Sequence, residues 1–254
     1  MSSELFDLTG RVAMVTGASR GIGQGIALGL AGAGADIVAI SRGSCEETER
    51  EVATLGRRFL HLPCDLAEAS VADLQKLVDQ AVELMGGLDI LVNAAGTITR
   101  HSVLEYPEEE WDQVLQVNLK AVMYLSQAAA RHFAEVGKGK IINIASALSV
   151  QGGILVPAYA AAKHGVVGVT RSLANELAAK GINVNAIIPG YILTDMTAPL
   201  AADPDRNEPI LARIPAGRWG KPSDFAGVAV FLASRASDYC DASIIAVDGG
   251  WLSR

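Results

Sequence analysis

Three side chains near the middle of the chain have the types and the spacing of a proton-transfer site. Ser146 follows residues 140–145, a short apolar and β-branched run that predicts a strand. Tyr159 and Lys163 lie within 158–179, an alanine-rich segment that predicts a helix, where residues four apart share a face. Open α/β sheets carry their chemistry where strands end. We therefore expect a hydroxyl, a phenol and an ammonium to converge at one sheet edge.

The chemistry of this trio is the transfer of a proton to or from an oxygen atom. A phenol with its ordinary pKa of about 10 exchanges protons poorly near neutral pH. We expect the Lys163 cation to favour the phenolate and so to lower the pKa of Tyr159. Tyr159 would then protonate a carbonyl or deprotonate an alcohol, while Ser146 hydrogen-bonds the same oxygen. Alone, Tyr-x-x-x-Lys also fits a packing tyrosine and a solvated lysine, so the assignment depends on the surrounding motifs.

The start of the chain predicts a phosphate site. Residues 11–17 form an apolar strand pattern that ends on glycine, and an amphipathic run follows to Ala33. The turn has the spacing Gly-x-x-x-Gly-x-Gly, where glycines let the backbone approach a pyrophosphate and the helix N-terminus supplies N–H groups. An ordinary strand-to-helix turn is the alternative. The candidate cofactor contacts here are Gly17, Ser19, Arg20, Gly21, Ile22 and Gly23.

The end of the second strand pattern, 36–40, bears on the choice of cofactor. NAD-type sites usually place an acid there to bind the ribose hydroxyls. This chain has Ser41 and Arg42, which suit a 2′-phosphate, and Arg20 supplies a second cation. NADP(H) is therefore favoured and NAD(H) is the alternative; both arginines also fit solvated surface charges.

Three later strand patterns, 59–66, 88–96 and 181–190, end in further candidate ligand contacts. Asp65 could accept a hydrogen bond from an adenine amino group or cap the following helix. Asn93 could instead tie neighbouring strands together. The candidates at these strand ends are Asp65, Leu66, Asn93, Ala94, Gly96, Pro189 and Gly190.

Longer segments complete the alternation of helices and strands. Residues 107–136 predict one long helix, in which the amide of Asn118 lies among apolar residues and is expected to be buried and functional rather than exposed. Residues 191–218 contain four prolines and little periodicity, which predicts a lid over the site. A helix at about 222–233 and a last strand at 242–248 follow. The whole pattern predicts an α/β fold, a Rossmann-like doubly wound parallel sheet with helices on both faces.

Composition limits the class of protein. The 254 residues, half of them hydrophobic, predict one globular domain over 1–254. The net charge of −7 argues against nucleic acid as a partner. The sequence has no segment typical of a signal peptide or a membrane span, so the cytoplasm is expected. Three widely spaced cysteines suggest neither a disulfide framework nor a metal site.

Together these motifs resemble the short-chain dehydrogenase/reductase family over almost the whole chain. The matching motifs, in order, are Thr16-Gly17-x-x-x-Gly21-x-Gly23, Asn93-Ala94-Ala95-Gly96, Asn118, Ser146, Tyr159-x-x-x-Lys163 and Pro189-Gly190. One departure is Ala94, where many members have a second asparagine. The resemblance implies a nicotinamide cofactor, a small-molecule substrate and a homotetramer.

The resemblance also implies roles for individual residues. Tyr159 would be the acid/base, Ser146 would orient the carbonyl, and Lys163 would hold the nicotinamide ribose and lower the pKa of the tyrosine. Asn118 would position a water molecule in a proton relay. The carboxamide of the cofactor would contact Ile192 and Thr194.

Within the family, the second half is most similar to the 2-deoxy-D-gluconate 3-dehydrogenase / 2-dehydro-3-deoxy-D-gluconate 5-dehydrogenase group. That group is usually described as NAD-linked, which keeps NAD(H) open. A sugar acid needs a partner for its carboxylate, and the guanidinium of Arg100 suits it. Gln151 and Tyr191 could contact its hydroxyls, whereas His101 and Trp219 fit rim or packing residues better. The segments that carry this similarity are 140–146, 151–153, 214–220 and 246–251.

Two other functions fit parts of the pattern. A 3-oxoacyl or general carbonyl reductase would use the same catalytic residues but would not need Arg100. A non-catalytic dinucleotide-binding sensor would have the same fold with a broken catalytic set, whereas this chain has Asn118, Ser146, Tyr159 and Lys163. The sequence therefore favours an NAD(P)-dependent oxidoreductase acting on a keto or hydroxyl group of a sugar acid.

Overall fold

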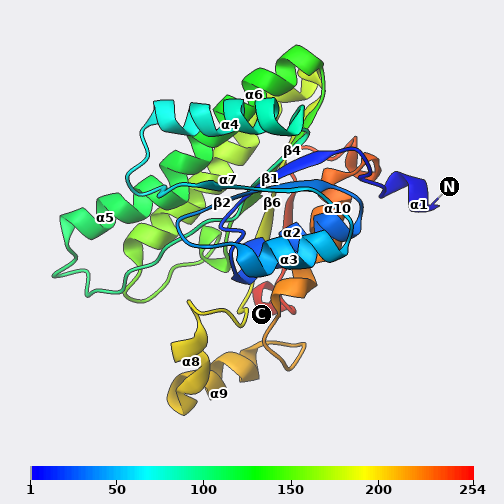
Figure 1. Ribbon diagram of the computed structural model, residues 1–254. Helices are drawn as coiled ribbons and strands as arrows, with labels where there is room; N and C mark the ends of the chain where they lie inside the picture. The colour runs from blue at the N-terminus through cyan, green and yellow to red at the C-terminus, as the bar shows by residue number, and fades with distance from the viewer. Residues whose placement is uncertain (1) are drawn as a thin grey trace.

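One sheet of seven parallel strands forms the centre of the molecule (Figure 1). The computed structural model describes residues 2–254. The strand order is β3-β2-β1-β4-β5-β6-β7, so the chain runs outward to one edge and then returns to build the other half. The predicted doubly wound fold is confirmed. The strands are β1 (Val12–Thr16), β2 (Asp36–Ser41), β3 (Phe59–Pro63), β4 (Ile90–Asn93), β5 (Gly139–Ile144), β6 (Ile182–Pro189) and β7 (Ile244–Val247).

Helices cover both faces of this sheet because its inner strands are apolar on both sides. Helices α4, α6 and α7 pack on one face, and α2, α3 and α10 pack on the other (Figure 1). The helices are α1 (Ser2–Leu5), α2 (Gly21–Gly32), α3 (Glu46–Thr54), α4 (Val71–Met85), α5 (Glu108–Leu115), α6 (Ala121–Val136), α7 (Pro157–Leu177), α8 (Ala198–Ala202), α9 (Pro204–Arg213) and α10 (Ala226–Ala233). No helix within residues 2–254 combines the length and apolar character needed to cross a membrane.

The predicted long helix over 107–136 is confirmed as continuous helical chain from Glu108 to Val136, but it is not uniform: a π-helical turn at Gln116–Lys120 lies between α5 and α6. Asn118 lies inside that turn. Its side-chain amide donates to the Val114 carbonyl at 2.9 Å, the acceptor that a regular helix would reserve for the backbone N–H of Asn118. The amide also donates to the Thr97 carbonyl at 2.8 Å. A contact to a distant loop therefore stabilises the irregular turn.

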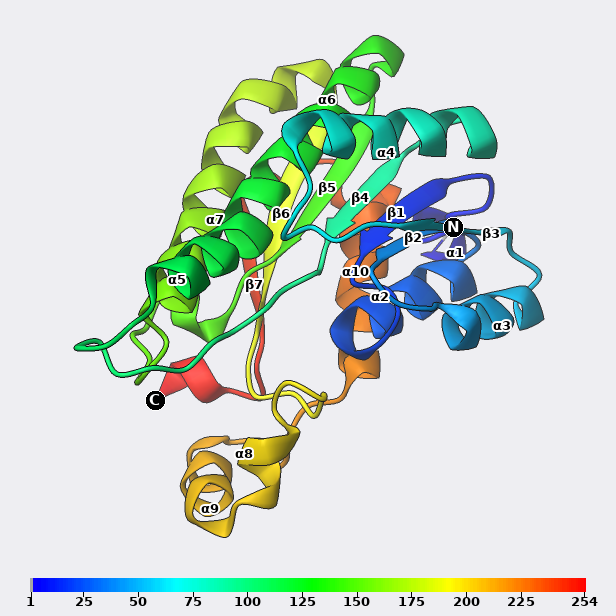
Figure 2. The ribbon, with the colours of Figure 1, turned by 60° about the vertical axis from the view of Figure 1, so that its left-hand side comes forward.

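The predicted lid, residues 191–218, contains two helices rather than irregular chain alone. Helices α8 and α9 stand apart from the sheet and its helical layers (Figure 2). The base of the segment is closed by backbone hydrogen bonds between Gly220 and residues 191 and 193, at 2.9 Å each. A small apolar cluster, which includes Ile210, Ile214, Trp219 and Trp251, packs α9 against the C-terminal end of the chain.

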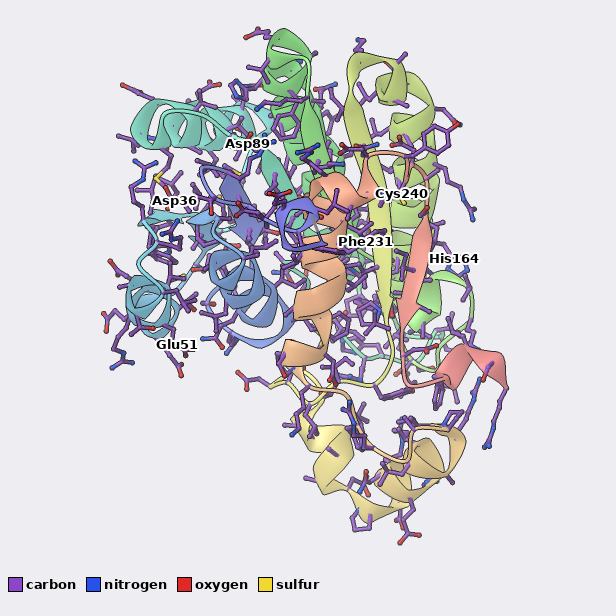
Figure 3. The ribbon with its side chains drawn as sticks, turned by 90° about the vertical axis from the view of Figure 1, so that its right-hand side faces the viewer. Asp36, Glu51, Asp89, His164, Phe231 and Cys240 are labelled. Carbon is purple, nitrogen blue, oxygen red and sulfur yellow. The ribbon has the colours of Figure 1, made fainter. Side chains whose placement is uncertain are left out.

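Aspartates anchor the amino ends of the strands, away from α8 and α9. Asp89 accepts hydrogen bonds from the Arg11 side chain at 2.6 Å and from the Val12 N–H at 3.1 Å. Asp36 accepts a hydrogen bond from the Arg58 side chain at 2.7 Å. Figure 3 shows both carboxylates on the opposite side of the molecule from α8 and α9. The carboxyl ends of the strands are therefore the ends that remain available for a ligand.

Two buried polar side chains hold those carboxyl ends together. The Thr16 hydroxyl, at the end of β1, accepts hydrogen bonds from the N–H groups of Ala94 and Ala95, both at 2.9 Å. Asn93, at the end of β4, donates to Asn143 on β5 at 2.9 Å and to the Ser126 hydroxyl at 3.0 Å. The interpretation of Asn93 as a tie between strands is confirmed. These bonds fix the spacing of β1, β4 and β5.

We predict that Thr16→Val lowers the free energy of unfolding by about 1–3 kcal/mol, because two backbone N–H groups lose their acceptor. Thr16→Ser keeps the hydroxyl and should remain close to the wild type. Urea denaturation of the three proteins measures the difference. Equal stability of the valine and serine variants would contradict this role of Thr16.

Candidate active site

A cavity of about 1040 Å³ follows the carboxyl ends of the strands. It contains most of the residues that the sequence marks as cofactor contacts, and it also contains Ser146 and Arg100. Strands β3 and β4 end at Pro63 and Asn93, earlier than predicted, so the residues after them belong to loops that line the cavity. The predicted cofactor contacts that line it are Gly17, Ser19, Arg20, Gly21, Ile22, Gly23, Ser41, Arg42, Asp65, Leu66, Ala94, Gly96, Tyr159, Lys163, Pro189, Gly190, Ile192 and Thr194.

The glycine loop has the geometry of a phosphate cradle. Gly17 has φ +68°, and a Cβ placed on it would lie 2.9 Å from the Cα of Ala95. A Cβ on Gly23 would lie 2.3 Å from the Gly17 carbonyl oxygen. Helix α2 begins at Gly21, and no side chain caps its N-terminus. The first N–H groups of α2 are thus left for an anion in the cavity.

The two residues expected to decide between NADP(H) and NAD(H), Ser41 and Arg42, differ in their exposure. Ser41 is buried, and its hydroxyl donates to the Gly43 carbonyl at 2.7 Å and lies 3.1 Å from His61 Nε2. Arg42 is exposed on the cavity wall, and its guanidinium lies 3.5 Å from the Asp65 carboxylate. Asp65 caps its own turn by accepting from Ala67 N–H at 2.9 Å, whereas Ser70 caps α4. Arg42 is thus the more accessible member of the Ser41-Arg42 pair.

A second ion pair lies on the cavity wall. Arg20, in the glycine loop, lies 2.9 Å from Asp195, at the base of the predicted lid, and both side chains are 72% exposed. An exposed pair of this kind contributes about 0–1 kcal/mol. An anionic ligand can therefore displace Asp195 from Arg20 at little cost.

The residues present fit a dinucleotide cofactor. The cavity has the size for one, uncapped N–H groups lie at its glycine loop, and guanidinium groups of Arg20 and Arg42 lie on its wall. This donor set suits a pyrophosphate and one further phosphate group. Asn93 does not line the cavity, so the structure places it beneath the site rather than in it.

The predicted trio does come together in the cavity. Ser146 begins a 3₁₀ turn, Ala147–Ser149, and its hydroxyl accepts from the Leu148 N–H at 3.1 Å. Tyr159 and Lys163 come from the first turns of α7, which begins at Pro157. The Lys163 side chain is 3% exposed, its ammonium donates to the Ile144 carbonyl at 2.6 Å, and it lies 5.6 Å from the centre of the Tyr159 ring.

The predicted lowering of the Tyr159 pKa by Lys163 is wrong in this structure. Burial raises the pKa of the Tyr159 phenol, and the Ser146 hydroxyl and the charge of Arg100 oppose that shift only in part. Burial also lowers the pKa of Lys163 to about 8. The phenol is therefore protonated at neutral pH and is set to donate its proton.

Asn118 is buried beneath the cavity wall and does not line it. Besides donating to Thr97, its amide accepts a hydrogen bond from the Thr97 N–H at 3.2 Å. This two-point contact fixes the loop after β4, in which Thr97 does line the cavity. The expectation that the Asn118 amide is buried is confirmed. A function for it, including the relay role implied by the resemblance, stays a prediction.

The predicted substrate contacts are only partly brought together. Arg100 lines the cavity with Ser146 and Tyr159. Gln151 and Tyr191 lie outside the lining and contact Trp251 instead. The interpretation of Trp219 as a packing residue is confirmed, since it is buried and its ring meets Tyr191 edge-on at 5.4 Å. His101 is partly exposed and lies 2.8 Å from Glu110 at the start of α5.

Some lining residues escaped the motif search. Thr97 and Ile98 follow β4, Ala145 follows β5, and Asp195 follows Thr194. Thr97, Ile98 and Ala145 could have been found from their position just after strand ends, because parallel strands open their carboxyl ends to the ligand. Asp195 lies further from a strand end and had no such signal.

Comparison with known proteins identifies relatives over nearly the whole chain. The family model described as "Enoyl-(Acyl carrier protein) reductase" matches residues 17–252. The chain is 57% identical over 250 residues to the 2-dehydro-3-deoxy-D-gluconate 5-dehydrogenase of Escherichia coli K12, covering 98% of both proteins.

Solved structures of dehydrogenases also match nearly the whole chain. An Agrobacterium tumefaciens protein provisionally assigned as a 2-deoxy-D-gluconate 3-dehydrogenase, with bound NADP, has a TM-score of 0.93 and 52% identity, covering 98% of this chain and 99% of that one. A gluconate 5-dehydrogenase from Burkholderia cenocepacia, in complex with NADP and tartrate, has a TM-score of 0.94 and 37% identity over 100% of both chains. The chain therefore belongs to the short-chain dehydrogenase/reductase family, the NAD(P)-dependent oxidoreductases that act on CH–OH groups.

Proposed function

We propose that this protein uses NADP(H) to interconvert a keto and a hydroxyl group of a sugar acid of the 2-keto-3-deoxygluconate or 2-deoxygluconate type. The observation that carries the proposal is the placement of Ser146, Tyr159, Lys163 and Arg100 around one cavity that also contains an uncapped helix N-terminus. The relatives named for 2-dehydro-3-deoxy-D-gluconate and gluconate dehydrogenation support this substrate class. The NADP bound to two related structures supports the cofactor.

Each part of the cavity supplies one step of the reaction. When bound, NADPH supplies the hydride that reduces the ketone carbon. Ser146 donates a hydrogen bond to the carbonyl oxygen and holds it beside Tyr159. As negative charge develops on that oxygen, the Tyr159 phenol gives up its proton, and the product is an alcohol. The hydrogen bond of Ser146 and the charge of Arg100, which both favour the ionised form of Tyr159, stabilise the phenolate left behind. The phenolate then regains its proton from solvent.

Arg100 is the proposed partner of the substrate carboxylate. It makes no ion pair within residues 2–254, whereas Arg20 and Arg42 each have an aspartate close by. A guanidinium offers paired donors that match a carboxylate. Its charge also lowers the pKa of Tyr159, so it influences the proton donor as well.

Two further roles belong to this proposal. Residues 191–218 act as a lid over the substrate, and Asn118 holds the loop that faces the catalytic residues. A homotetramer is what the family resemblance implies, and a cytoplasmic location is what the sequence pattern leads us to expect; both stay predictions.

We predict that Tyr159→Phe reduces turnover about 10²–10⁴-fold, because the ketone oxygen loses its proton donor. The dissociation constant for NADPH, measured by fluorescence titration, should stay within about threefold of the wild-type value. Tyr239→Phe, at a fully exposed tyrosine, is the matched control and should behave as the wild type. Loss of cofactor binding together with turnover would argue against the role of Tyr159 as proton donor.

We predict that Arg100→Ala raises the KM for a keto sugar acid about tenfold, because a charge-assisted hydrogen bond to the carboxylate is lost. Steady-state kinetics with an acid substrate and with an uncharged acetoacetyl thioester separate the loss of carboxylate binding from a general effect on substrate binding. The thioester KM should not change. Arg131→Ala, at an arginine paired with Gln75 on α4, is the control. An equal rise of KM for both substrates would remove Arg100 from carboxylate recognition.

We predict that Lys163→Met stabilises the protein at pH 7 by about 1–3 kcal/mol while abolishing turnover. The pKa of Lys163 is about 8 when folded, against its ordinary value of 10.5. Below pH 8 the buried charge costs about 3 kcal/mol, and replacement of such groups by apolar ones is often stabilising.

The stability difference between Lys163→Met and the wild type should depend on pH, because the pKa of Lys163 differs between the folded and unfolded chain. Between pH 8 and 10.5 the unfolded wild-type chain binds more protons than the folded one, so the cost of burying Lys163 falls as pH rises. The advantage of the methionine variant should therefore shrink from pH 7 to pH 10 in urea denaturation. An advantage that does not depend on pH would contradict the assignment of this cost to the lysine charge.

A further inference from the structure

Trp251, near the C-terminus, contacts three parts of the chain that are far apart in sequence. The side chain is 7% exposed. The Arg213 guanidinium lies 3.9 Å from the centre of its ring, and the Tyr191 ring centre lies 4.5 Å away. Its indole N–H donates to the Gln151 side-chain oxygen at 3.0 Å. One side chain thus joins residues 151, 191 and 213.

Two of these contacts belong to the predicted lid. Tyr191 is its first residue, and its carbonyl accepts from the Gly220 N–H at 2.9 Å, which closes the base of the segment. Arg213 is the last residue of α9. Trp251 therefore holds both the base of the lid and its longer helix.

The third contact belongs to the loop that carries Ser146. The backbone N–H of Gln151 donates to the Ala147 carbonyl at 3.1 Å, one residue from Ser146. The same loop continues to Leu155, whose carbonyl accepts from the His101 N–H at 3.0 Å, next to Arg100. Gln151 therefore links Trp251 to the turn that places the Ser146 hydroxyl.

The backbone around Trp251 is built to hold it in place. Asp248 accepts hydrogen bonds from the Gly250 N–H at 2.8 Å and from the Leu252 N–H at 2.9 Å. Gly250 has φ +89°, and a Cβ on it would lie 2.8 Å from the Pro215 side chain. This turn therefore sets the position of the indole against the lid with little freedom.

We propose that Trp251 is a positioning residue that couples the lid to the Ser146 loop, so that closure of the lid over substrate fixes the catalytic hydroxyl. Neither Trp251 nor Gln151 lines the cavity, so both act through the residues they contact. This inference rests on the proposed function. It also gives Gln151 and Tyr191 a role other than the substrate contact expected from the sequence.

The test removes the side-chain hydrogen bond between Trp251 and Gln151 from each of its two sides. Gln151→Leu removes the acceptor, and Trp251→Phe removes the donor but keeps an aromatic ring against Tyr191 and Arg213. We expect each to raise the KM for a keto sugar acid about five- to tenfold, with the dissociation constant for NADPH within twofold of wild type. Because both substitutions break the same bond, the double variant should be no worse than the worse single variant. Gln75→Leu, which removes a hydrogen-bonded amide on α4, is the matched control.

Hydrogen exchange gives a second readout that does not need turnover. In Gln151→Leu, amides of α9 should exchange at least about fivefold faster, although the substituted residue lies outside the lid. Unchanged KM and unchanged α9 exchange in an active enzyme would overturn the coupling while leaving the proposed function intact. A wild-type enzyme that reduces no keto sugar acid would overturn the proposed function, and the exchange of α9 would still decide the coupling. Equal losses in KM, kcat and NADPH affinity would indicate a merely structural role and would also overturn it.

Discussion

A lysine ammonium held out of water close to a phenol is the constraint on which the rest of the site depends. Lys163 is 3% exposed, and its ammonium donates to the Ile144 carbonyl at the end of β5. That carbonyl is in place because β5 is paired on both sides and its end is tied to β4 through Asn93. The same helix, α7, supplies Lys163 and Tyr159. The sheet therefore positions the carbonyl that accepts from Lys163, and one helix positions both the cation and the proposed proton donor.

The cavity is positive although the protein as a whole is acidic. The net charge is −7, yet guanidinium groups of Arg20, Arg42 and Arg100 lie on the wall. Asp195 and Asp65 neutralise the first two through exposed ion pairs at 2.9 and 3.5 Å. In the function we propose, an anionic cofactor would replace these weak surface pairs with its own phosphates, and Arg100 would remain for an anionic substrate. This arrangement explains how two negatively charged molecules can share one cavity.

Local patterns predicted the sheet, the glycine loop and the convergence of Ser146, Tyr159 and Lys163, because strand period, helical spacing and turn glycines are properties of neighbouring residues. The π-helical turn at Asn118 could not be predicted in this way, since it depends on a bond to Thr97, 21 residues away. The contact that takes Gln151 out of the cavity spans 100 residues. The direction of the Tyr159 pKa depends on burial, which the folded chain sets and a motif does not.

The most direct test of this account is the rate at which purified protein oxidises NADPH and NADH in the presence of 2,5-dioxo-3-deoxyhexonate, an alginate-derived keto-deoxyuronate or an acetoacetyl thioester. We predict fast oxidation of NADPH with a keto sugar acid, slower oxidation of NADH, and little reaction with the thioester. Reaction with the thioester alone would contradict the substrate class and would place the protein among acyl reductases. A clear preference for NADH would contradict the role given to Arg42. Tight cofactor binding without oxidation by any carbonyl compound would indicate a sensor rather than an enzyme.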